Sequence, residues 1–217
     1  MNFEQARANM VEQQIRPWDV LDQRVLDIIT EVPREHFVSD EYLGVAYADS
    51  NIPLGHGESM MAPKLEARMI QALNIENDEH VLEVGTGSGY VAALMSRLAR
   101  RVTSVEIYPA FLQTAEKRLQ KHGYTNVECL EGDGCRGWAE NAPYDVIALT
   151  GSLASLDPIF ESQLSIGGRL FAVIGDSPIM NAELITRTDE NTYTRETLFE
   201  TDLKPLVGAE AVKAFNF

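Results

Sequence analysis

The sequence predicts an α/β fold with a doubly wound, mostly parallel sheet, N-terminal helices and an antiparallel C-terminal hairpin. Three observations predict it. Short apolar runs typical of strands alternate with amphipathic helical segments from residue 81 onward. The run 144–149 has a fully apolar centre, as expected of a strand covered on both faces. A Gly-rich turn at 85–89 follows a strand and precedes a helix, which is a usual ligand-binding position in such sheets.

Helices are predicted in the first third of the chain. The first covers 3–15 and ends before Pro17. Asp19 can cap a second helix, whose apolar face carries Leu21, Val25, Ile28 and Ile29. A turn-rich stretch with glycines and prolines follows at 42–63. Pro63 then begins a third helix that runs to residue 73.

Strands and helices alternate in the remainder of the chain. Strands are expected at 81–84, 102–105, 127–130, 144–149 and 169–174. Helices are expected between them at 90–100, 109–122 and 156–164. The last two runs, 182–188 and 193–199, alternate in polarity on either side of a polar turn. They predict an antiparallel hairpin at one edge of the sheet.

Composition excludes several classes of function. The chain of 217 residues carries 33 acidic and 18 basic side chains, a net charge of −15. Nucleic-acid binding is not expected, because phosphate contacts depend on Lys and Arg. No apolar run is long enough for a membrane span, and the N-terminus lacks the apolar segment of a signal peptide. Cys129 and Cys135 are expected as free thiols with no metal site, which fits a cytoplasmic protein.

The Gly-rich turn carries the strongest functional signal. Gly85, Gly87 and Gly89 form G-x-G-x-G, with Glu83 inside the preceding strand. In the fingerprint of NAD-binding proteins the third glycine would fall at Tyr90 instead. The spacing found here suits a ligand without a pyrophosphate.

Two carboxylates follow the next strands. Glu106 ends the second strand, where a carboxylate can accept hydrogen bonds from ribose hydroxyls. Asp133 follows the third strand between two glycines, where it can accept from an adenine amino group. Each residue alone could be an ordinary strand end or turn. Together, at the carboxyl ends of successive strands, they indicate a nucleoside-binding crevice.

These motifs resemble those of class I S-adenosylmethionine-dependent methyltransferases. The matching segments are E-V-G-T-G-S-G-Y at 83–90, V-E-I at 105–107, G-D-G at 132–134, Y-D-V-I at 144–147 and G-G-R-L at 167–170. More narrowly, the chain is similar to the protein L-isoaspartyl O-methyltransferase family. That similarity rests on V-P-R-E-x-F-V at 32–38, on 53–69, and on L-K-P-L-V at 203–207. It covers nearly the whole chain.

The resemblance implies a Rossmann-like methyltransferase sheet in a single domain. Residues 1–63 would supply N-terminal helices and an acceptor loop, 64–175 the cofactor-binding core, and 176–217 the C-terminal hairpin and tail. The cofactor would be S-adenosylmethionine, held by Glu83, Gly85, Thr86, Gly87, Ser88, Gly89, Glu106, Ile107, Asp133, Gly134 and Thr150. The acceptor would be the α-carboxylate of an L-isoaspartyl residue in damaged peptides or proteins. A carboxylate is already ionised at pH 7, so it needs no general base.

The acceptor loop departs from the family pattern T-I-S-x-P. Here Ser59 stands for the threonine and Met61 for the serine that donates to the acceptor carboxylate. A thioether cannot donate. The catalytic positions are therefore expected at Ser59 and Met61, with His56 as a further candidate donor. The segment 150–155 after the fourth strand also departs from the family.

The departures leave alternatives to isoaspartyl repair open. A methyltransferase of the same fold could act on another carboxylate or on a small molecule. A low-turnover cofactor-binding regulatory protein is a second alternative. A nicotinamide oxidoreductase is a third, against which the glycine spacing argues.

Overall fold

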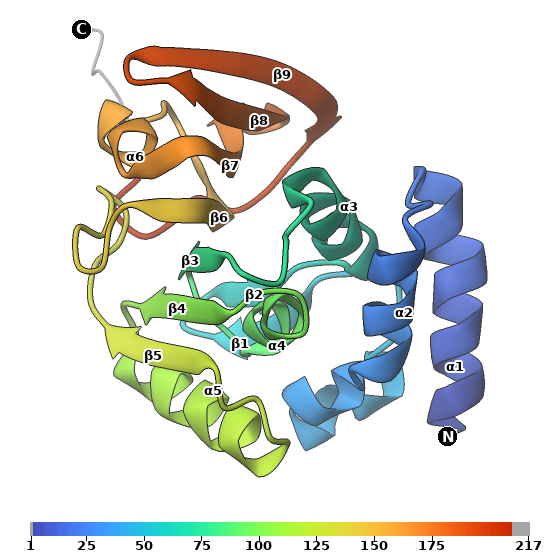
Figure 1. Cartoon of the computed structure of the whole chain (residues 1–217). Coiled ribbons are helices and arrows are strands. Elements are labelled where there is room, and N and C mark those ends of the chain that lie inside the picture. The colour runs from blue at the N-terminus through green and yellow to red at the C-terminus, as the bar shows by residue number, and fades with distance from the viewer. Residues whose placement is uncertain (1, 210–217) are drawn as a thin grey trace, which may run out of the picture.

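The computed structural model describes residues 2–209, which form one large sheet flanked by helices and a small separate hairpin (Figure 1). The large sheet has the strand order β5-β4-β3-β6-β7-β8-β9. Strands β3 to β7 pair in parallel, and β8 and β9 are antiparallel. Their bounds are His80–Val84 (β3), Arg101–Glu106 (β4), Val127–Glu131 (β5), Tyr144–Leu153 (β6), Leu164–Asp176 (β7), Ile179–Asp189 (β8) and Thr192–Thr201 (β9). The predicted fold class, including the C-terminal hairpin, is confirmed; residues 210–217 of the predicted tail lie outside the described range.

Burial on both faces explains the apolar central strands. In β6, Val146 and Ala148 belong to a core cluster with the N-terminal helices, whereas Ile147 and Leu149 belong to a second cluster on the other face. Successive side chains of a strand point to opposite faces. A strand buried twice must therefore be apolar at every position, as the sequence indicated.

The helices pack mainly on one face of the sheet. They are α1 (Phe3–Met10), α2 (Gln23–Glu31), α3 (Pro63–Leu73), α4 (Tyr90–Ser96), α5 (Pro109–Lys121) and α6 (Pro158–Ser162). Residues of α1 to α4 and Leu119 of α5 enter the first core cluster, and Phe160 of α6 enters the second. No helix within residues 2–209 is long and apolar enough to cross a membrane.

The chain is helical over 3–15, as predicted, whereas the predicted cap of the second helix is wrong. After α1 the chain continues as a π-helix (Val11–Ile15) and a 3-10 helix (Arg16–Trp18), which Asp19 ends in the left-handed conformation at φ 58°. Asp22, not Asp19, caps α2, by accepting a 2.8 Å hydrogen bond from the Arg24 amide. Leu21 therefore precedes the helix and is 69% exposed, whereas Val25, Ile28 and Ile29 are buried as predicted.

Other boundaries differ for local reasons. Helix α4 ends at Ser96 rather than at 100, where Asn126 Nδ2 donates to the Ser96 and Ala99 carbonyls and holds a non-helical turn. Helix α6 is shorter than 156–164, because Asp157 caps it and Pro158 begins it. Two 3-10 segments, Arg34–Phe37 and Asp40–Val45, precede a hairpin of β1 (Ile52–Gly55) and β2 (Glu58–Met60) inside the stretch predicted as turns.

Arg169 of β7 joins the sheet to the end of α3. Its guanidinium contacts both carboxylate oxygens of Glu79. It also donates to the carbonyls of Leu73 at 2.7 Å and Asn74 at 2.6 Å. These carbonyls lack hydrogen-bond donors within the helix, so the Arg169 guanidinium provides the donors at the helix C-terminus.

We expect Arg169→Lys to lower the free energy of unfolding by about 1–3 kcal/mol, because an ammonium cannot reproduce this fork of donors. Urea unfolding measures the change. Arg195→Lys is the matched control, since Arg195 pairs with Glu161 at an exposed position, and there we expect a change within about 0.5 kcal/mol. Equal stability of Arg169→Lys and wild type would contradict this role of the guanidinium.

Candidate functional site

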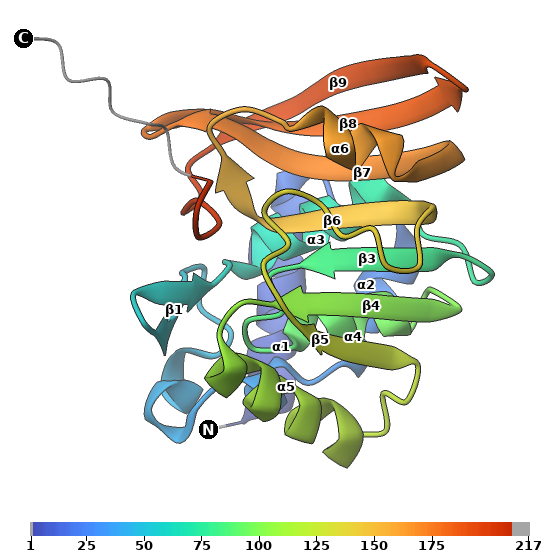
Figure 2. The same ribbon diagram turned by 90° about the vertical axis from the view of Figure 1, so that its left-hand side faces the viewer.

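A cleft lies at the edge of the sheet where the parallel strands end. Its empty space is about 700 Å³, including the open mouth. The chain runs from β3 to β4 and β5 on one side and then returns to β6 on the other, so the strand order reverses at β3. Doubly wound sheets bind ligands outside the carboxyl ends of strands at such a reversal. Figure 2 shows β1 beside these strand ends.

The Gly-rich turn runs so close to β6 that a side chain would not fit. Gly85 has φ +99°, and a Cβ built on it would lie 2.3 Å from Thr150 Oγ1. The Thr150 hydroxyl is fixed beside the turn, 2.8 Å from the Val84 carbonyl and 2.6 Å from that of Gly85. Backbone alone lines this part of the cleft, so a ligand can approach the main chain directly.

Glu106 ties the turn to the end of β4. The residue is 5% exposed, and its carboxylate accepts from the Gly87 amide at 2.8 Å and the Tyr108 amide at 2.9 Å. Each oxygen keeps lone pairs for a further donor. The carboxylate is thus held in one orientation and can still accept hydrogen bonds from a ligand.

Asp133 follows the neighbouring strand β5, lines the same cleft and is exposed. One carboxylate oxygen accepts from the Cys135 amide at 3.0 Å. Gly134 beside it leaves no room for a side chain, because a Cβ there would lie 2.8 Å from Val84 Cγ1. Burial raises the pKa of the Cys135 thiol to about 11, and Asp133 adds to this shift, so the thiol stays neutral at pH 7.

The structure divides the predicted site residues between two adjoining cavities. The cleft is lined by Ser59, Gly85, Gly87, Glu106, Ile107, Asp133, Gly134 and Thr150. A second cavity of about 300 Å³ is lined by Ser59, Met61, Glu83, Gly85, Thr86, Gly87, Ser88 and Thr150. Gly89 lines neither. A Cβ on it would lie 3.1 Å from that of Ala115, so its absent side chain allows α5 to pack closely.

The β1–β2 hairpin covers part of the cleft, which the sequence did not predict. His56, at the tip of the β1–β2 hairpin, stacks on Tyr108 with ring centroids 4.8 Å apart and meets the Phe111 edge. Lys204 Nζ donates to the Gly57 carbonyl at 2.8 Å and to Glu58 Oε1 at 2.6 Å. His56 packs the hairpin against Tyr108 and Phe111, and it lines neither cavity. In the sequence, only the glycines at the hairpin tip indicated this arrangement.

Buried charged side chains surround the second cavity, and of these the sequence had indicated only Glu83. Arg34 donates to Glu66 Oε2 and, at 2.6 Å, to the Met61 carbonyl. Glu83 Oε2 accepts from Ser104, whose hydroxyl lies 2.6 Å from that of Thr86. Arg34 stands inside the V-P-R-E motif, but its partner is 32 residues away, so only the fold identifies it.

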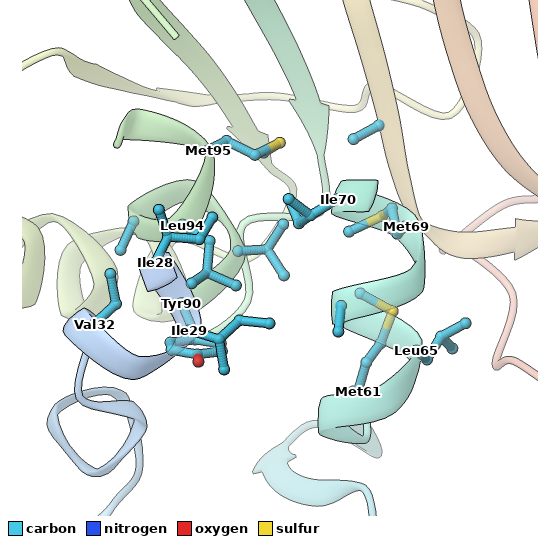
Figure 3. Close-up of a cluster of buried hydrophobic side chains, with 14 of the residues drawn as sticks. Ile28, Ile29, Val32, Met61, Leu65, Met69, Ile70, Tyr90, Leu94 and Met95 are labelled. Carbon is cyan, nitrogen blue, oxygen red and sulfur yellow. The ribbon is translucent and has the colours of Figure 1, made fainter. Parts of the chain in front are cut away.

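Met61 packs in the core rather than offering a polar group. Its side chain is 5% exposed and lies among Ile29, Leu65, Met69 and Tyr90 (Figure 3). Methionine commonly fills such irregular gaps. Among the described residues, no group of three or more His, Cys, Asp or Glu side chains is placed to hold a metal ion.

The fold and cleft together define a nucleoside-binding protein of the doubly wound, Rossmann-like class, with a Gly-rich first turn and carboxylates after the next two strands. A family model described as protein-L-isoaspartate(D-aspartate) O-methyltransferase matches residues 5–211. The chain belongs to that family.

Relatives of known name agree. The chain is 42% identical over 203 residues to a protein-L-isoaspartate O-methyltransferase of Protochlamydia amoebophila, covering 93% of this chain and 96% of the relative. It is 39% identical over 210 residues to protein-L-isoaspartate O-methyltransferase 2 of Pelobacter propionicus, covering 96% and 93%.

Solved structures share the fold. A protein-L-isoaspartate O-methyltransferase superposes with a TM-score of 0.80 at 28% identity, covering 95% of this chain and 66% of that longer chain. A candidate enzyme of this kind from Plasmodium falciparum, solved with S-adenosyl-L-homocysteine, has a TM-score of 0.78 at 18% identity and covers 95% and 98%. The second likeness concerns the fold alone.

We expect Gly85→Ala to destabilise the protein by about 2–4 kcal/mol, through both steric overlap and an unfavourable φ. Adding Thr150→Ala removes the overlapping hydroxyl, so the double variant should be less destabilised than the sum of the single changes. Chemical denaturation of the four proteins measures this coupling. Gly44→Ala is the control, since nothing lies within 4 Å of its added methyl. Strict additivity would contradict the overlap.

Proposed function

We propose that this protein is an S-adenosylmethionine-dependent O-methyltransferase that esterifies the α-carboxylate of L-isoaspartyl residues in damaged proteins. The observation that carries the proposal is the cleft at the carboxyl ends of β3 to β6, in a chain that belongs to the isoaspartyl methyltransferase family. The two free cysteines support a cytoplasmic location for this repair activity.

The cleft fits the cofactor. Gly85 and Gly87 present bare backbone, Glu106 has accepting capacity for ribose hydroxyls, and Asp133 keeps an oxygen for the adenine amino group. Bound there, S-adenosylmethionine supplies a methyl group on a positively charged sulfur. Ile107, Gly134 and Thr150 shape the walls around these groups.

The chain's own residues position the acceptor and exclude water. An acceptor carboxylate is ionised near neutral pH, so no side chain has to remove a proton from it. Rate then comes from alignment with the methyl group and from a dry site. Ser59 lines both cavities and is half-buried, so its hydroxyl is the donor that we assign to the acceptor carboxylate.

The burial of Met61 favours one alternative function, a methyltransferase of the same fold with a different acceptor. With an apolar side chain in place of the expected donor, the same fold could serve another carboxylate or a small-molecule acceptor. The identity of the methylated product and the effects of changing Ser59 and Met61 distinguish the two.

The direct test is methyl transfer from labelled S-adenosylmethionine to an isoaspartyl peptide. We expect label that mild base releases as volatile methanol, because the product is an ester, and no label on the matched aspartyl peptide. Asp133→Ala should weaken S-adenosylhomocysteine binding several-fold without changing the melting temperature, since Asp133 is exposed. Base-stable label would argue against a carboxylate acceptor.

We expect Ser59→Ala to lower kcat/KM on the isoaspartyl peptide by roughly 10- to 100-fold, the worth of one hydrogen bond to a charged group. Met61→Ser should lower the melting temperature and leave turnover per folded molecule unchanged, because Met61 packs in the core. If Ser59→Ala kept full activity, Ser59 would not be the donor. If Met61→Ser raised activity ten-fold or more, the pocket would be built for another acceptor.

A further inference from the structure

Charge is distributed unevenly around the cleft. Its lining carries the carboxylates of Glu58, Glu106 and Asp133, and among the described lining residues Lys204 is the one basic side chain. The adjoining second cavity has acidic lining residues and, within the part of the chain that the structure describes, no basic one. Like charges repel strongly at short range where water is partly excluded. An anionic acceptor therefore meets side-chain charge of the favourable sign only at Lys204.

The backbone of Lys204 is fixed on the sheet beside the cleft. Its carbonyl accepts from the Ser152 amide of β6 at 2.9 Å, and the Leu206 amide donates to the Ser152 carbonyl at 3.0 Å. The Ser152 hydroxyl also donates to the Leu203 carbonyl at 2.6 Å, and both of these residues are buried. The Lys204 side chain therefore starts from a fixed base and reaches the β1–β2 hairpin from there.

The ammonium group of Lys204 lies beside the residues that precede Ser59. Its Nζ is 2.8 Å from the Gly57 carbonyl and 2.6 Å from Glu58 Oε1, and a Cβ built on Gly57 would lie 3.5 Å from it. An ammonium has three N–H donors, so these two contacts leave one for a ligand. The Lys204 side chain is 45% exposed, so a ligand in the cleft can reach that donor. Ser59, the donor already assigned to the acceptor, follows directly in β2.

We propose that the Lys204 ammonium binds the acceptor carboxylate together with the Ser59 hydroxyl, and so selects anionic acceptors. This inference rests on the proposed function and adds a charged donor to it. Glu58 opposes the selection, because its carboxylate occupies one N–H of Lys204 and repels a second carboxylate. A carboxylate of the protein and a carboxylate of the acceptor therefore share one positive charge.

The same contacts hold the β1–β2 hairpin, and a role confined to holding it has a different consequence. Lys204→Met removes both the charge and the donors. Glu58→Gln removes the opposite charge but keeps an oxygen that can accept from Nζ. If Lys204 only held the hairpin, the two changes would act in the same direction, because each weakens one contact. If Lys204 binds the acceptor, they act in opposite directions on the preference for a charged acceptor.

The test measures by calorimetry how the S-adenosylhomocysteine complex binds an isoaspartyl peptide and its α-amide counterpart, in which an uncharged amide replaces the α-carboxylate. The sulfur of this ligand is uncharged, so it adds nothing to a preference for the carboxylate. We expect wild type to bind the isoaspartyl peptide roughly ten-fold more tightly, the worth of one charge-assisted hydrogen bond, and salt should reduce this ratio. Equal affinities in a wild type that methylates the isoaspartyl peptide would overturn the Lys204 site and leave the proposed function standing. Absence of both binding and methyl transfer would overturn both.

Variants then assign the preference to Lys204. Lys204→Met should reduce the ratio of the two affinities to about two-fold or less, and Glu58→Gln should raise it about two-fold or more. Lys64→Met and Asp49→Asn are the matched controls, because Lys64 Nζ pairs with Asp49 at 2.8 Å and neither residue lines the two cavities. If Lys204→Met does not fold, Lys204→Gln replaces it, since its amide can still donate to the Gly57 carbonyl. An unchanged ratio in the folded Lys204 variant, or a ratio that fails to rise in Glu58→Gln, would overturn the assignment.

Discussion

The close approach between the Gly-rich turn and Thr150 is the constraint on which the site depends. The turn leaves β3 and must reach α4 while β6 lies directly beside it, which leaves no room for a side chain at Gly85. The same constraint brings the Gly87 amide to the Glu106 carboxylate. This part of the cleft is thus shaped by bare backbone packed against the Thr150 side chain.

The buried guanidinium of Arg34 joins three parts of the chain around the second cavity. Arg34 holds the Met61 carbonyl, which belongs to the segment between β2 and α3, and Glu66, which belongs to the first turns of α3. Its guanidinium also lies 4.9 Å from the centre of the Tyr90 ring on α4. A charge this deeply buried is restricted to a single arrangement of its partners. Moving the start of α3 away from Arg34 would therefore separate a buried ion pair.

Local rules explain which features were predictable. The parallel strands, Glu106 and Asp133 follow from periodicity and from position after a strand, and helix α3 follows from Pro63 and apolar spacing. Helix α2 is capped by Asp22 and not by the predicted Asp19. Both acidic residues lie just before the helix, and the local sequence does not distinguish between them. The Arg34–Glu66 pair and the Lys204–Glu58 contact depend on residues distant in sequence, which no window of sequence can reveal.

The contact between Lys204 and the β1–β2 hairpin has a consequence for the order in which the protein folds. Lys204 and the hairpin that it holds are 146 and 147 residues apart in sequence at their two contacts. Contacts between distant residues form late, because closing a long loop costs entropy before the contact repays it. During synthesis the strands that carry the Gly-rich turn, Glu106 and Asp133 emerge before residues 203–207 are made. In a nascent chain the strand ends that line the cleft can therefore assemble before Lys204 is available to hold the β1–β2 hairpin beside them.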